Sequence, residues 1–395
     1  MVSINKQSFK GRKAIIRVDF NVPMNLEKKV LDNSRIQAAK STILKVINDG
    51  GSCILISHLG RPKGKEKKYS LEPIIPEIER ILQKKVMFSE DVLGKKTKEL
   101  TKSLEPGQIL LLENIRFYSE ETNGNEMFAK KLATYADCYI NDAFGTAHRA
   151  HASTTVIAKF FSKNKFSGHL LSKEVESIKK VLEAGEKPLL AILGGAKVSS
   201  KITIIESVIN KVDEIIIGGG MAFTFIKALG GKIGDSICED DKVDLALSIL
   251  EKAKTKGVNV HLPVDVICSK KFSNEGIKKT EDINNIPNDW QGLDAGPKSI
   301  KAFDKVVKRA KTILWNGPIG VFELESFSKG TIALGESIAE STTKGAFSLV
   351  GGGDSVAAVK KFKFQDKVSY VSTGGGAMLE SLEGKALPGI VALSN

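Results

Sequence analysis

Arginine is scarce in this sequence of 395 residues. Only eight of the 59 basic residues are arginine, and seven of those eight precede residue 150. Lysine supplies most of the positive charge, and the formal net charge is +13 at pH 7. A basic surface favours anionic partners. Because the lysines are dispersed and only 6% of residues are aromatic, the sequence gives little support to nucleic-acid binding.

Cysteine and long apolar runs are scarce too. The four cysteines are scattered and form no CxxC pair, which argues against a zinc site or a disulfide framework and fits a reducing compartment. The first residues contain no apolar core of the kind that a secretory signal needs. The longest nearly apolar run, 215–226, is too short to span a bilayer. We therefore expect a cytoplasmic protein without a membrane partner.

Several catalytic motifs are missing, and each absence removes a class of enzyme. The sequence has no GxxxxGK[ST], which argues against a P-loop NTPase, and no GxGxxG after a strand, which argues against a dinucleotide dehydrogenase. HRD and DFG are absent, which excludes a protein kinase at the level of motifs. The motif GxSxG is absent as well. No HExxH or other metal-ligand spacing occurs.

Short β-branched runs alternate with amphipathic, helix-length segments along the whole chain. The runs include KAIIRVDF, SCILIS, QILLLEN, PLLAIL and TILWNG, and the helical segments include 35–48, 199–210, 240–256 and 328–340. This alternation predicts an α/β protein with parallel sheets. The chain is longer than one core usually supports, and the polar stretch 159–187 marks a midpoint. We predict two doubly wound, Rossmann-like domains joined by a helix at 170–183.

The arginines of the first half follow its predicted strands, where parallel sheets bind ligands. The guanidinium fork suits bidentate contact with phosphate or carboxylate. Any single arginine could instead pair with a surface acid, but five in such positions argue for a site that binds a small anion carrying phosphate and carboxylate. These five are Arg17, Arg35, Arg61, Arg116 and Arg149, and His58 stands beside Arg61. The histidines of GTAHRAH are more simply explained as structural.

Glycine clusters follow the predicted strands of the second half, in which Arg309 is the only arginine. They occur in LGGAKVSSK, IGGGMAF, WNGPIGVFE, VGGGDSVAA and STGGGAMLE. A glycine turn that enters a helix presents free N–H groups and the positive end of the helix dipole to a phosphate. One GGG alone would more simply be a turn, but three triplets after apolar strands predict a nucleotide site.

Asp354 and two lysines stand out by their positions in these segments. Asp354 follows Gly353, where it could meet a magnesium ion carried by the nucleotide or cap the following helix. Lys197 and Lys201 lie in and just after GGAK, beside the predicted phosphate-binding turn.

These segments, in this order, resemble the phosphoglycerate kinase family. The resemblance extends from RVDFNVP near the start to VSTGGGA near the end and covers essentially the whole chain. It implies reversible phosphoryl transfer between ATP and the carboxylate of 3-phosphoglycerate, with Mg²⁺, giving ADP and 1,3-bisphosphoglycerate in glycolysis and gluconeogenesis. Small departures, such as Ser199 and Ser200 before Lys201, lie away from the transferred group.

The resemblance also implies the positions of the sites and the domains. It implies a phosphoglycerate site at Asp19, Asn21, Arg35, His58, Arg61, Arg116 and Arg149. It implies a nucleotide site at Gly194, Gly195, Lys201, Gly218, Gly219, Gly292, Asn316, Pro318, Glu323, Gly352, Gly353, Asp354 and Ser355, with Asp354 toward the metal. The phosphoglycerate-binding domain would comprise 1–169 and 384–395, the hinge helix 170–183, and the nucleotide-binding domain 184–383.

The chemistry of the implied reaction indicates what the protein must supply. A carboxylate acceptor is already ionised at neutral pH and needs no general base. Catalysis then consists of positioning and of charge stabilisation around the transferring phosphoryl group. The candidates are Arg35, Lys197 and the backbone N–H groups of Gly374 and Gly375. Because the two sites fall on different domains, we expect closure about the helix at 170–183.

Two other classes of function remain open at this stage. One is a phosphotransferase that makes an acyl phosphate from another carboxylate, which an acceptor comparison between acetate and 3-phosphoglycerate would detect. The other is a basic nucleic-acid-binding protein, whose binding to RNA would depend steeply on salt. We expect a monomer that binds small molecules.

Overall fold

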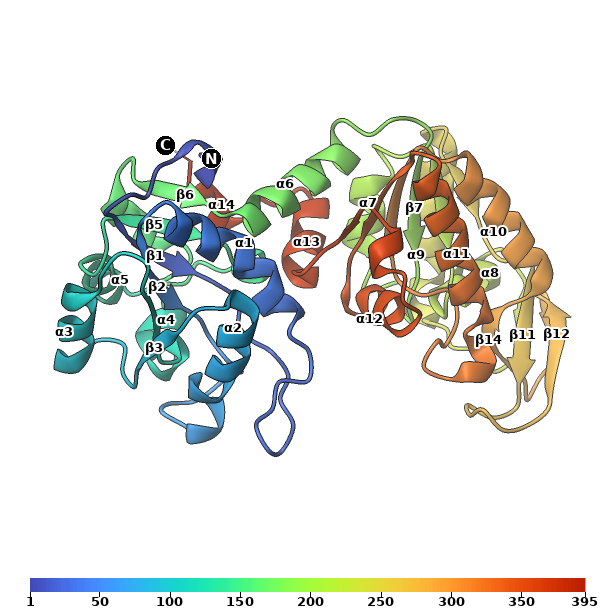
Figure 1. Cartoon of the computed structure of the whole chain (residues 1–395). Coiled ribbons are helices and arrows are strands. Elements are labelled where there is room, and N and C mark those ends of the chain that lie inside the picture. Colours follow the sequence, from blue (N-terminus) through green and yellow to red (C-terminus); the bar gives the residue numbers. More distant parts are fainter. Residues whose placement is uncertain (395) are drawn as a thin grey trace. The chain divides into compact units, whose positions relative to one another are not determined.

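The computed structural model describes residues 1–394 and consists of two compact units. Unit 1 comprises Met1–Glu176 and Ala386–Asn395, and unit 2 comprises Ser177–Lys385 (Figure 1). The division falls within helix α6 (His169–Leu182), the segment in which the sequence suggested a junction. Asn395, the last residue of the expected C-terminal segment 384–395, lies outside the described residues.

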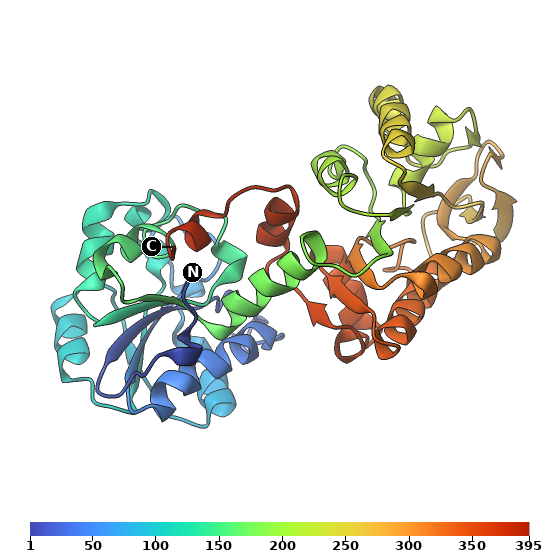
Figure 2. The same cartoon turned by 90° about the horizontal axis from the view of Figure 1, so that it is seen from above.

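Unit 1 is built on a six-stranded parallel sheet with helices on both sides (Figure 2). Its strands are short apolar runs, and β2 and β4 are buried along their whole length, as expected for a parallel sheet covered on both faces. The strand order is β3-β4-β2-β1-β5-β6. The strands are β1 (Lys13–Arg17), β2 (Ser52–Ile56), β3 (Val86–Ser89), β4 (Ile109–Leu112), β5 (Cys138–Asn141) and β6 (Lys165–Ser167).

Helices α1 (Ser34–Asn48) and α2 (Ile75–Leu82) bury their apolar stripes in the core of this sheet. Ile36, Ala39 and Ile43 recur at helical spacing along α1, so that one side of the helix is apolar. The other α-helices of the unit are α3 (Lys95–Ser103), α4 (Ser119–Thr122), α5 (Glu126–Ala133) and α14 (Pro388–Val391).

Helix α14 ties the end of the chain to the loop after β5. The Gly389 N–H donates to the Ala147 carbonyl over 2.8 Å, and the Asn141 side chain donates to the Gly389 carbonyl over 3.4 Å. The C-terminal segment therefore packs beside the GTAHRAH segment of unit 1.

Unit 2 contains a second six-stranded parallel sheet, in the order β10-β8-β7-β15-β16-β17. The two doubly wound, Rossmann-like sheets confirm the predicted fold class. Trp315, the fourth residue of the five-residue strand β15, is fully buried between this sheet and its covering helices. The strands are β7 (Leu189–Leu193), β8 (Glu214–Ile217), β10 (Asn259–His261), β15 (Thr312–Asn316), β16 (Phe347–Val350) and β17 (Tyr370–Val371).

Unit 2 also contains strands that the alternation pattern did not predict. An antiparallel sheet is formed by β11 (Asp265–Ser269), β12 (Lys278–Asp282) and β14 (Gln291–Ala295), and β9 (Lys232–Ile233) pairs with β13 (Asn285–Ile286). The edge strand β12 has the sequence KKTED and alternates between exposed and partly buried positions. It has no continuous apolar run, and for this reason the sequence signal for a buried strand is missing.

The helices of unit 2 differ from the predicted ranges mainly at their ends. The helix expected at 199–210 is α7 (Ile202–Val208), because Ser199 donates from its N–H and its hydroxyl to Glu239 instead of continuing a helix. The segment expected at 240–256 begins as a 3-10 turn before α9 (Val243–Thr255). The others are α8 (Met221–Ala228), α10 (Pro297–Arg309), α11 (Lys329–Thr343), α12 (Gly353–Lys361) and α13 (Gly375–Leu382). Among the described helices, none combines the length and the apolar character that a membrane crossing requires.

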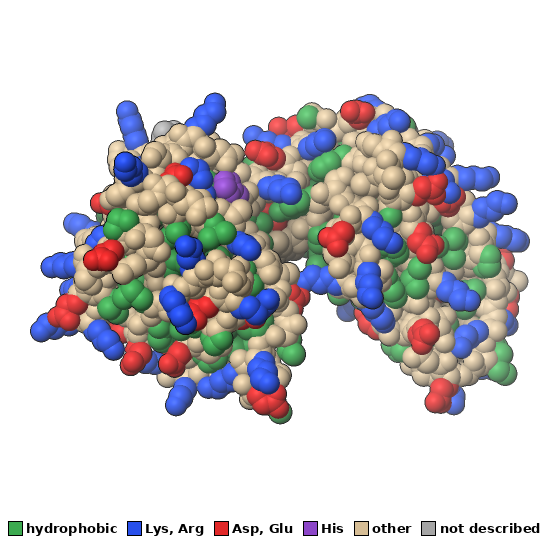
Figure 3. Space-filling view, in the orientation of Figure 1, with side chains coloured by type: hydrophobic (Ala, Val, Ile, Leu, Met, Phe, Trp, Pro, Cys, Tyr) green, Lys and Arg blue, Asp and Glu red, His purple; other side chains and the backbone are tan. Residues whose placement is uncertain are grey.

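Lysine and arginine side chains are spread over the visible face with acidic side chains among them (Figure 3). Many lysines take part in ion pairs, such as Lys308 with Asp304 at 3.0 Å and with Glu340 at 3.2 Å. The positive charge of the chain is thus distributed over a solvated surface.

Arg309, the only arginine of the second half, has a structural role. Its guanidinium donates from Nε to Glu214 Oε1 over 2.6 Å and from Nη2 to Glu214 Oε2, and His261 Nε2 lies 2.8 Å from the same carboxylate. Burial opposes ionisation of Glu214, but the hydrogen bonds from Arg309 and His261 outweigh it and lower the pKa of Glu214. These contacts join the end of α10 to β8 and β10.

We expect Arg309→Ala to destabilise unit 2 by about 1 kcal/mol, because it leaves the buried Glu214 carboxylate without its forked donor. Lys308→Ala, one position earlier in the same helix, is the control and should change stability by only a few tenths of a kcal/mol (about 0.3). Both tryptophans of the chain, Trp290 and Trp315, lie in unit 2, so their fluorescence during urea unfolding reports on this unit alone. Equal losses of unfolding free energy for the two variants would contradict the structural role of Arg309.

Candidate functional site

A cavity of about 590 Å³ lies in unit 1 and is lined by three of the predicted arginines, Arg61, Arg116 and Arg149. We call it the arginine cavity. Arg61 follows β2, Arg116 follows β4, and Arg149 follows β5, so that all three come from the carboxyl ends of parallel strands. The convergence of three separate loops explains why arginines far apart in the sequence meet.

Arg116 is the most constrained of the three arginines. Its Nη1 donates to the Gly60 carbonyl over 2.8 Å, while its Nε is buried and has no hydrogen-bond partner within residues 1–394. Burial, followed by the charges of Arg17 and Arg149, lowers the pKa of Arg116 to about 10. The guanidinium therefore stays charged at neutral pH in a place that favours a negative partner.

Asp19, Asn21 and Arg35 form one hydrogen-bonded group beside this cavity. Arg35 Nη1 donates to Asp19 Oδ1 and to the Asn21 carbonyl, both over 3.0 Å. The Asn21 side chain accepts the Gly60 N–H over 2.8 Å, which links the group to the loop that also holds Arg116. Arg35 is thus held in place by Asp19 while about a third of its side chain (34%) stays accessible.

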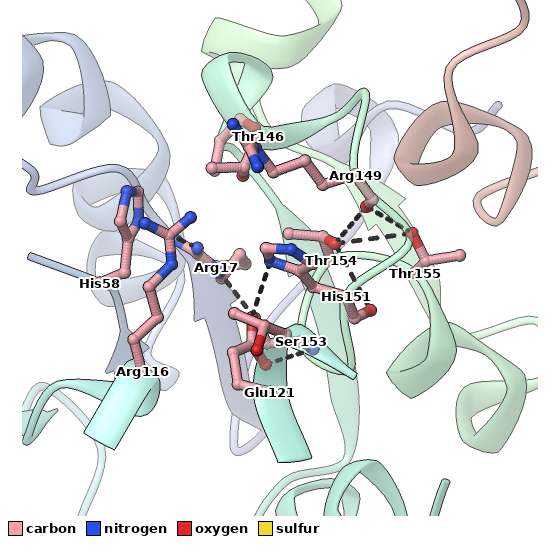
Figure 4. A network of polar contacts seen from close by, with 12 residues as sticks. Arg17, His58, Arg116, Glu121, Thr146, Arg149, His151, Ser153, Thr154 and Thr155 are labelled. Carbon is pink, nitrogen blue, oxygen red and sulfur yellow. Dashed lines mark hydrogen bonds and ion pairs between the residues drawn. The ribbon is translucent and has the colours of Figure 1, made fainter. Parts of the chain in front are cut away.

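His58 lies beneath the surface and contacts Arg17 (Figure 4). Its Nδ1 is 3.2 Å from Arg17 Nη2. Burial, and then the charges of Arg17, Arg116 and Arg35, hold the pKa of His58 well below its usual value. The imidazole is therefore neutral at physiological pH. All seven residues implied for the phosphoglycerate site lie within unit 1. Six of them line the cavity or are linked by these hydrogen bonds, and His58 contacts the buried Arg17.

Two residues near the cavity have roles that the sequence did not reveal. Arg17 was grouped with the strand-end arginines, but it points inward, is fully buried and supports the site from below. His151, for which the sequence favours a structural role, also lines the arginine cavity. Burial and the charges of Arg116 and Arg17 lower the pKa of His151 to about 4. The pairing of His151 with Arg149 in GTAHRAH is a signal that could have identified it.

A second cavity of about 590 Å³, which we call the glycine cavity, lies in unit 2. Apolar side chains such as Phe223, Val266 and Leu293 form much of its wall. Of the residues implied for the nucleotide site, it is lined by Gly195, Gly218, Gly219, Gly292, Pro318, Glu323 and Asp354.

Gly292, which lines the glycine cavity, and Gly194 lie where a side chain would clash with other parts of the protein. A Cβ atom on Gly292 would overlap the ring of Phe223, and one on Gly194 would overlap the backbone of Gly317 and Pro318. The fold therefore requires glycine at both positions, and at Gly292 the bare backbone forms part of the cavity wall.

Lys201 and Asn316 form a polar group with the N-terminus of α12. Lys201 Nζ donates to Asn316 Oδ1, Asn316 Nδ2 donates to the Gly351 carbonyl over 2.7 Å, and the Gly317 N–H donates to Ser355 Oγ over 2.5 Å. Burial lowers the pKa of Lys201, and the charge of Asp354 opposes this shift.

Gly352 and Gly353 begin α12, and Asp354 occupies its first turn. The cap position belongs to Gly352, so the alternative that Asp354 is the N-cap is wrong. The carboxylate of Asp354 is exposed and lines the glycine cavity.

The residues suggested for catalysis in unit 2 lie on two different turns. Gly374 is the cap residue of α13, and a Cβ on Gly375 would lie 3.4 Å from the Gly352 Cα. The N-termini of α12 and α13 are therefore adjacent. Lys197 is exposed on the turn that precedes α7.

No cluster of three or more His, Cys, Asp or Glu that could hold a metal ion occurs within residues 1–394. Three carboxylates line the glycine cavity, and of these Asp354 lies in the first turn of α12, next to the glycine turn. One carboxylate is compatible with Mg²⁺ that is also bound by water and by the phosphates of a ligand.

Comparisons with known proteins identify the family. A sequence profile described as phosphoglycerate kinase matches residues 4–385. Phosphoglycerate kinase of Porphyromonas gingivalis is 50% identical over 99% of this chain and 100% of its own length, and cytosolic phosphoglycerate kinase 3 of Arabidopsis thaliana is 49% identical over 99% and 97%.

Solved structures agree with this result. Phosphoglycerate kinase from Coxiella burnetii is 43% identical, with a TM-score of 0.91, over 99% of this chain and 98% of the other. The enzyme from Pyrococcus horikoshii is 30% identical, with a TM-score of 0.83, over 100% and 98%. The chain belongs to the phosphoglycerate kinase family of phosphotransferases, whose reaction is a step of glycolysis.

Proposed function

We propose that the arginine cavity binds 3-phosphoglycerate, that the glycine cavity binds ATP or ADP, and that Mg²⁺ accompanies the nucleotide. The observation that carries this proposal is the crowding of charged guanidinium groups in unit 1. Arg116 keeps a buried Nε–H without a partner in the described chain, and Arg61 and Arg149 line the same cavity. A ligand with two anionic groups would relieve this repulsion and satisfy the donors.

The residues of unit 1 suit a phosphorylated hydroxy acid. Arg61, Arg116 and Arg149 present forked donors to an anion, while Asp19 orients Arg35 toward a second one. A plain carboxylic acid such as acetate would leave most of these donors unpaired. This argues against an acyl-phosphate kinase for a small unphosphorylated acid.

The residues of unit 2 suit a nucleoside phosphate. The apolar wall of the glycine cavity can hold a purine base, and Gly195, Gly218 and Gly219 let phosphates approach backbone N–H groups. Asp354 would hold Mg²⁺ together with the ligand's phosphates, and the ion would neutralise their charge. Lys201 and Asn316 would bind and orient the phosphate chain.

The transfer itself requires alignment and charge stabilisation. Arg35 and Lys197, with the N–H groups of Gly374 and Gly375, would stabilise the charge on the transferring phosphoryl group. The acceptor carboxylate attacks without losing a proton, so no general base is assigned. We further propose that the chain acts as a cytoplasmic monomer. Its relatives include proteins named cytosolic and one named chloroplastic.

Arg35→Lys should preserve the fold and lower kcat by about 100- to 1,000-fold, because lysine cannot reproduce the fixed fork that Asp19 orients. The assay is ATP-dependent phosphorylation of 3-phosphoglycerate, coupled to a reductase that consumes 1,3-bisphosphoglycerate. Arg80→Lys is the control, because Arg80 pairs with Glu77 on an exposed face of α2. A near-normal kcat for Arg35→Lys would remove Arg35 from the catalytic group.

Gly292→Val should raise the Kd for ADP by at least about tenfold, because the new side chain would clash with Phe223 and Val266 and displace these two residues of the cavity wall. The Kd for 3-phosphoglycerate should stay the same, which provides an internal control. Calorimetric titration with each ligand measures both values. Unchanged ADP binding would place the nucleotide elsewhere.

Domain closure about α6 should be visible in solution. Closure would exclude water that hydrolyses the acyl phosphate. Small-angle scattering should show a smaller radius of gyration with both substrates bound than with either one alone. Equal radii in all three states would count against closure.

A further inference from the structure

Beneath the arginine cavity, a buried network joins two opposite charges to His58. Arg17, at the end of β1, and Glu121, in α4, both have no exposed area (0%). Ser153, also fully buried, lies between them (Figure 4). Neither charge has an obvious part in phosphoryl transfer, yet burying two charged groups is costly unless they are paired.

The direction of each hydrogen bond in this network is fixed by chemistry. A guanidinium can only donate, so the Arg17 Nε–H donates to Ser153 Oγ over 2.8 Å. The Ser153 hydroxyl must then donate onward, to Glu121 Oε1 at 2.7 Å, and the Ser153 N–H donates to Glu121 Oε2 over 2.9 Å. Glu121 therefore orients Ser153, and Ser153 orients Arg17 together with the Val18 carbonyl, which accepts from Arg17 Nη1.

The contact with Arg17 also determines which nitrogen of His58 carries the proton. Arg17 Nη2 lies 3.2 Å from His58 Nδ1, and because Arg17 donates, Nδ1 must accept. A neutral imidazole that accepts at Nδ1 carries its proton on Nε2. Within the described chain, His58 Nε2 has no hydrogen-bond partner, and 4% of the surface of the residue is exposed to solvent. Nε2–H is thus the group that remains for a ligand.

We propose that Glu121 is a positioning residue for the anion site: through Ser153 and Arg17 it holds His58 in the Nε2–H tautomer, which donates to the bound acid. The opposite tautomer would present a lone pair from Nε2 to an anion and would repel it. This inference rests on the proposed assignment of the arginine cavity to 3-phosphoglycerate. Glu121 would act on the bound acid only through Ser153, Arg17 and His58, without contacting it.

The neutral state of His58 agrees with this role. Burial and the charges of Arg17, Arg116 and Arg35 all disfavour the imidazolium form. A neutral ring can hold either tautomer, so something must select one of the two. Arg17 supplies that selection. Burial raises the pKa of Glu121, while the charge of Arg17 and the hydrogen bonds from Ser153 favour the ionised carboxylate, which is the counter-charge to Arg17.

The first test uses the full-length wild-type protein without ligand. Nitrogen NMR of histidine labelled with ¹⁵N should show His58 with a protonated Nε2 and an unprotonated Nδ1 between pH 6.5 and 8. The chain contains only five histidines, and the spectrum of His58→Phe identifies the signal. A proton on Nδ1 would overturn the proposal.

The second test cuts the network without removing a charge. Ser153→Ala should raise the KM for 3-phosphoglycerate about tenfold, and His58 should then populate both tautomers. The KM for ATP should stay constant and kcat should stay within about threefold, since the nucleotide residues and Arg35 are untouched. A purely structural role would lower stability without changing the tautomer, so an unchanged tautomer and KM would refute the proposal.

The third test replaces the buried carboxylate itself, in the variant Glu121→Gln. It should raise the same KM at least as much as Ser153→Ala, while Glu126→Gln removes one charge from the exposed start of α5 and should not raise it. If Glu121→Gln does not fold, Ser153→Ala and the wild-type spectrum decide the matter. Failure of the proposed substrate site would look different, because wild-type protein would then show no calorimetric binding of 3-phosphoglycerate.

Discussion

The arrangement of unit 1 depends on keeping several arginines charged at close range in the absence of ligand. Arg116 loses part of its basicity through burial and through the charges of Arg17 and Arg149, and two nearby histidines are held neutral. The like charges of these arginines repel one another, and the stability of the surrounding fold compensates for this repulsion. The anion proposed for this cavity would gain affinity from relieving the repulsion between the arginines as well as from the hydrogen bonds that it would form.

The two units differ in the residues that line their cavities, which are arginines in unit 1 and glycine turns in unit 2. In the proposed function, unit 1 recognises a small, highly charged acid, for which rigid guanidinium groups supply strong, directional donors. Unit 2 would hold a larger ligand with an apolar base and a charged tail, and bare backbone at glycine turns suits the tail. This division explains the uneven use of arginine along the chain, since Arg309 serves structure and not a ligand.

Much of the fold followed from the sequence, because buried parallel strands are continuous apolar runs with polar loops at their ends. The antiparallel sheet was not predicted, since KKTED in β12 lacks such a run. The arginine cluster was predictable from position, but the inward orientation of Arg17 was not, because the side to which a strand-end residue points depends on the register with β2 and β5. Glu121 and Ser153 gave no signal, as isolated polar residues are usually solvated.

Helix α14 has a consequence for how the protein is made. The Gly389 N–H completes its bond to Ala147 only after every residue of unit 2 has been synthesised, although Ala147 belongs to the loop that carries Arg149. On the ribosome, unit 2 can thus acquire its full set of contacts while unit 1 still lacks its final piece. The loop that carries Arg149 therefore receives this backbone contact only after unit 2 has been synthesised.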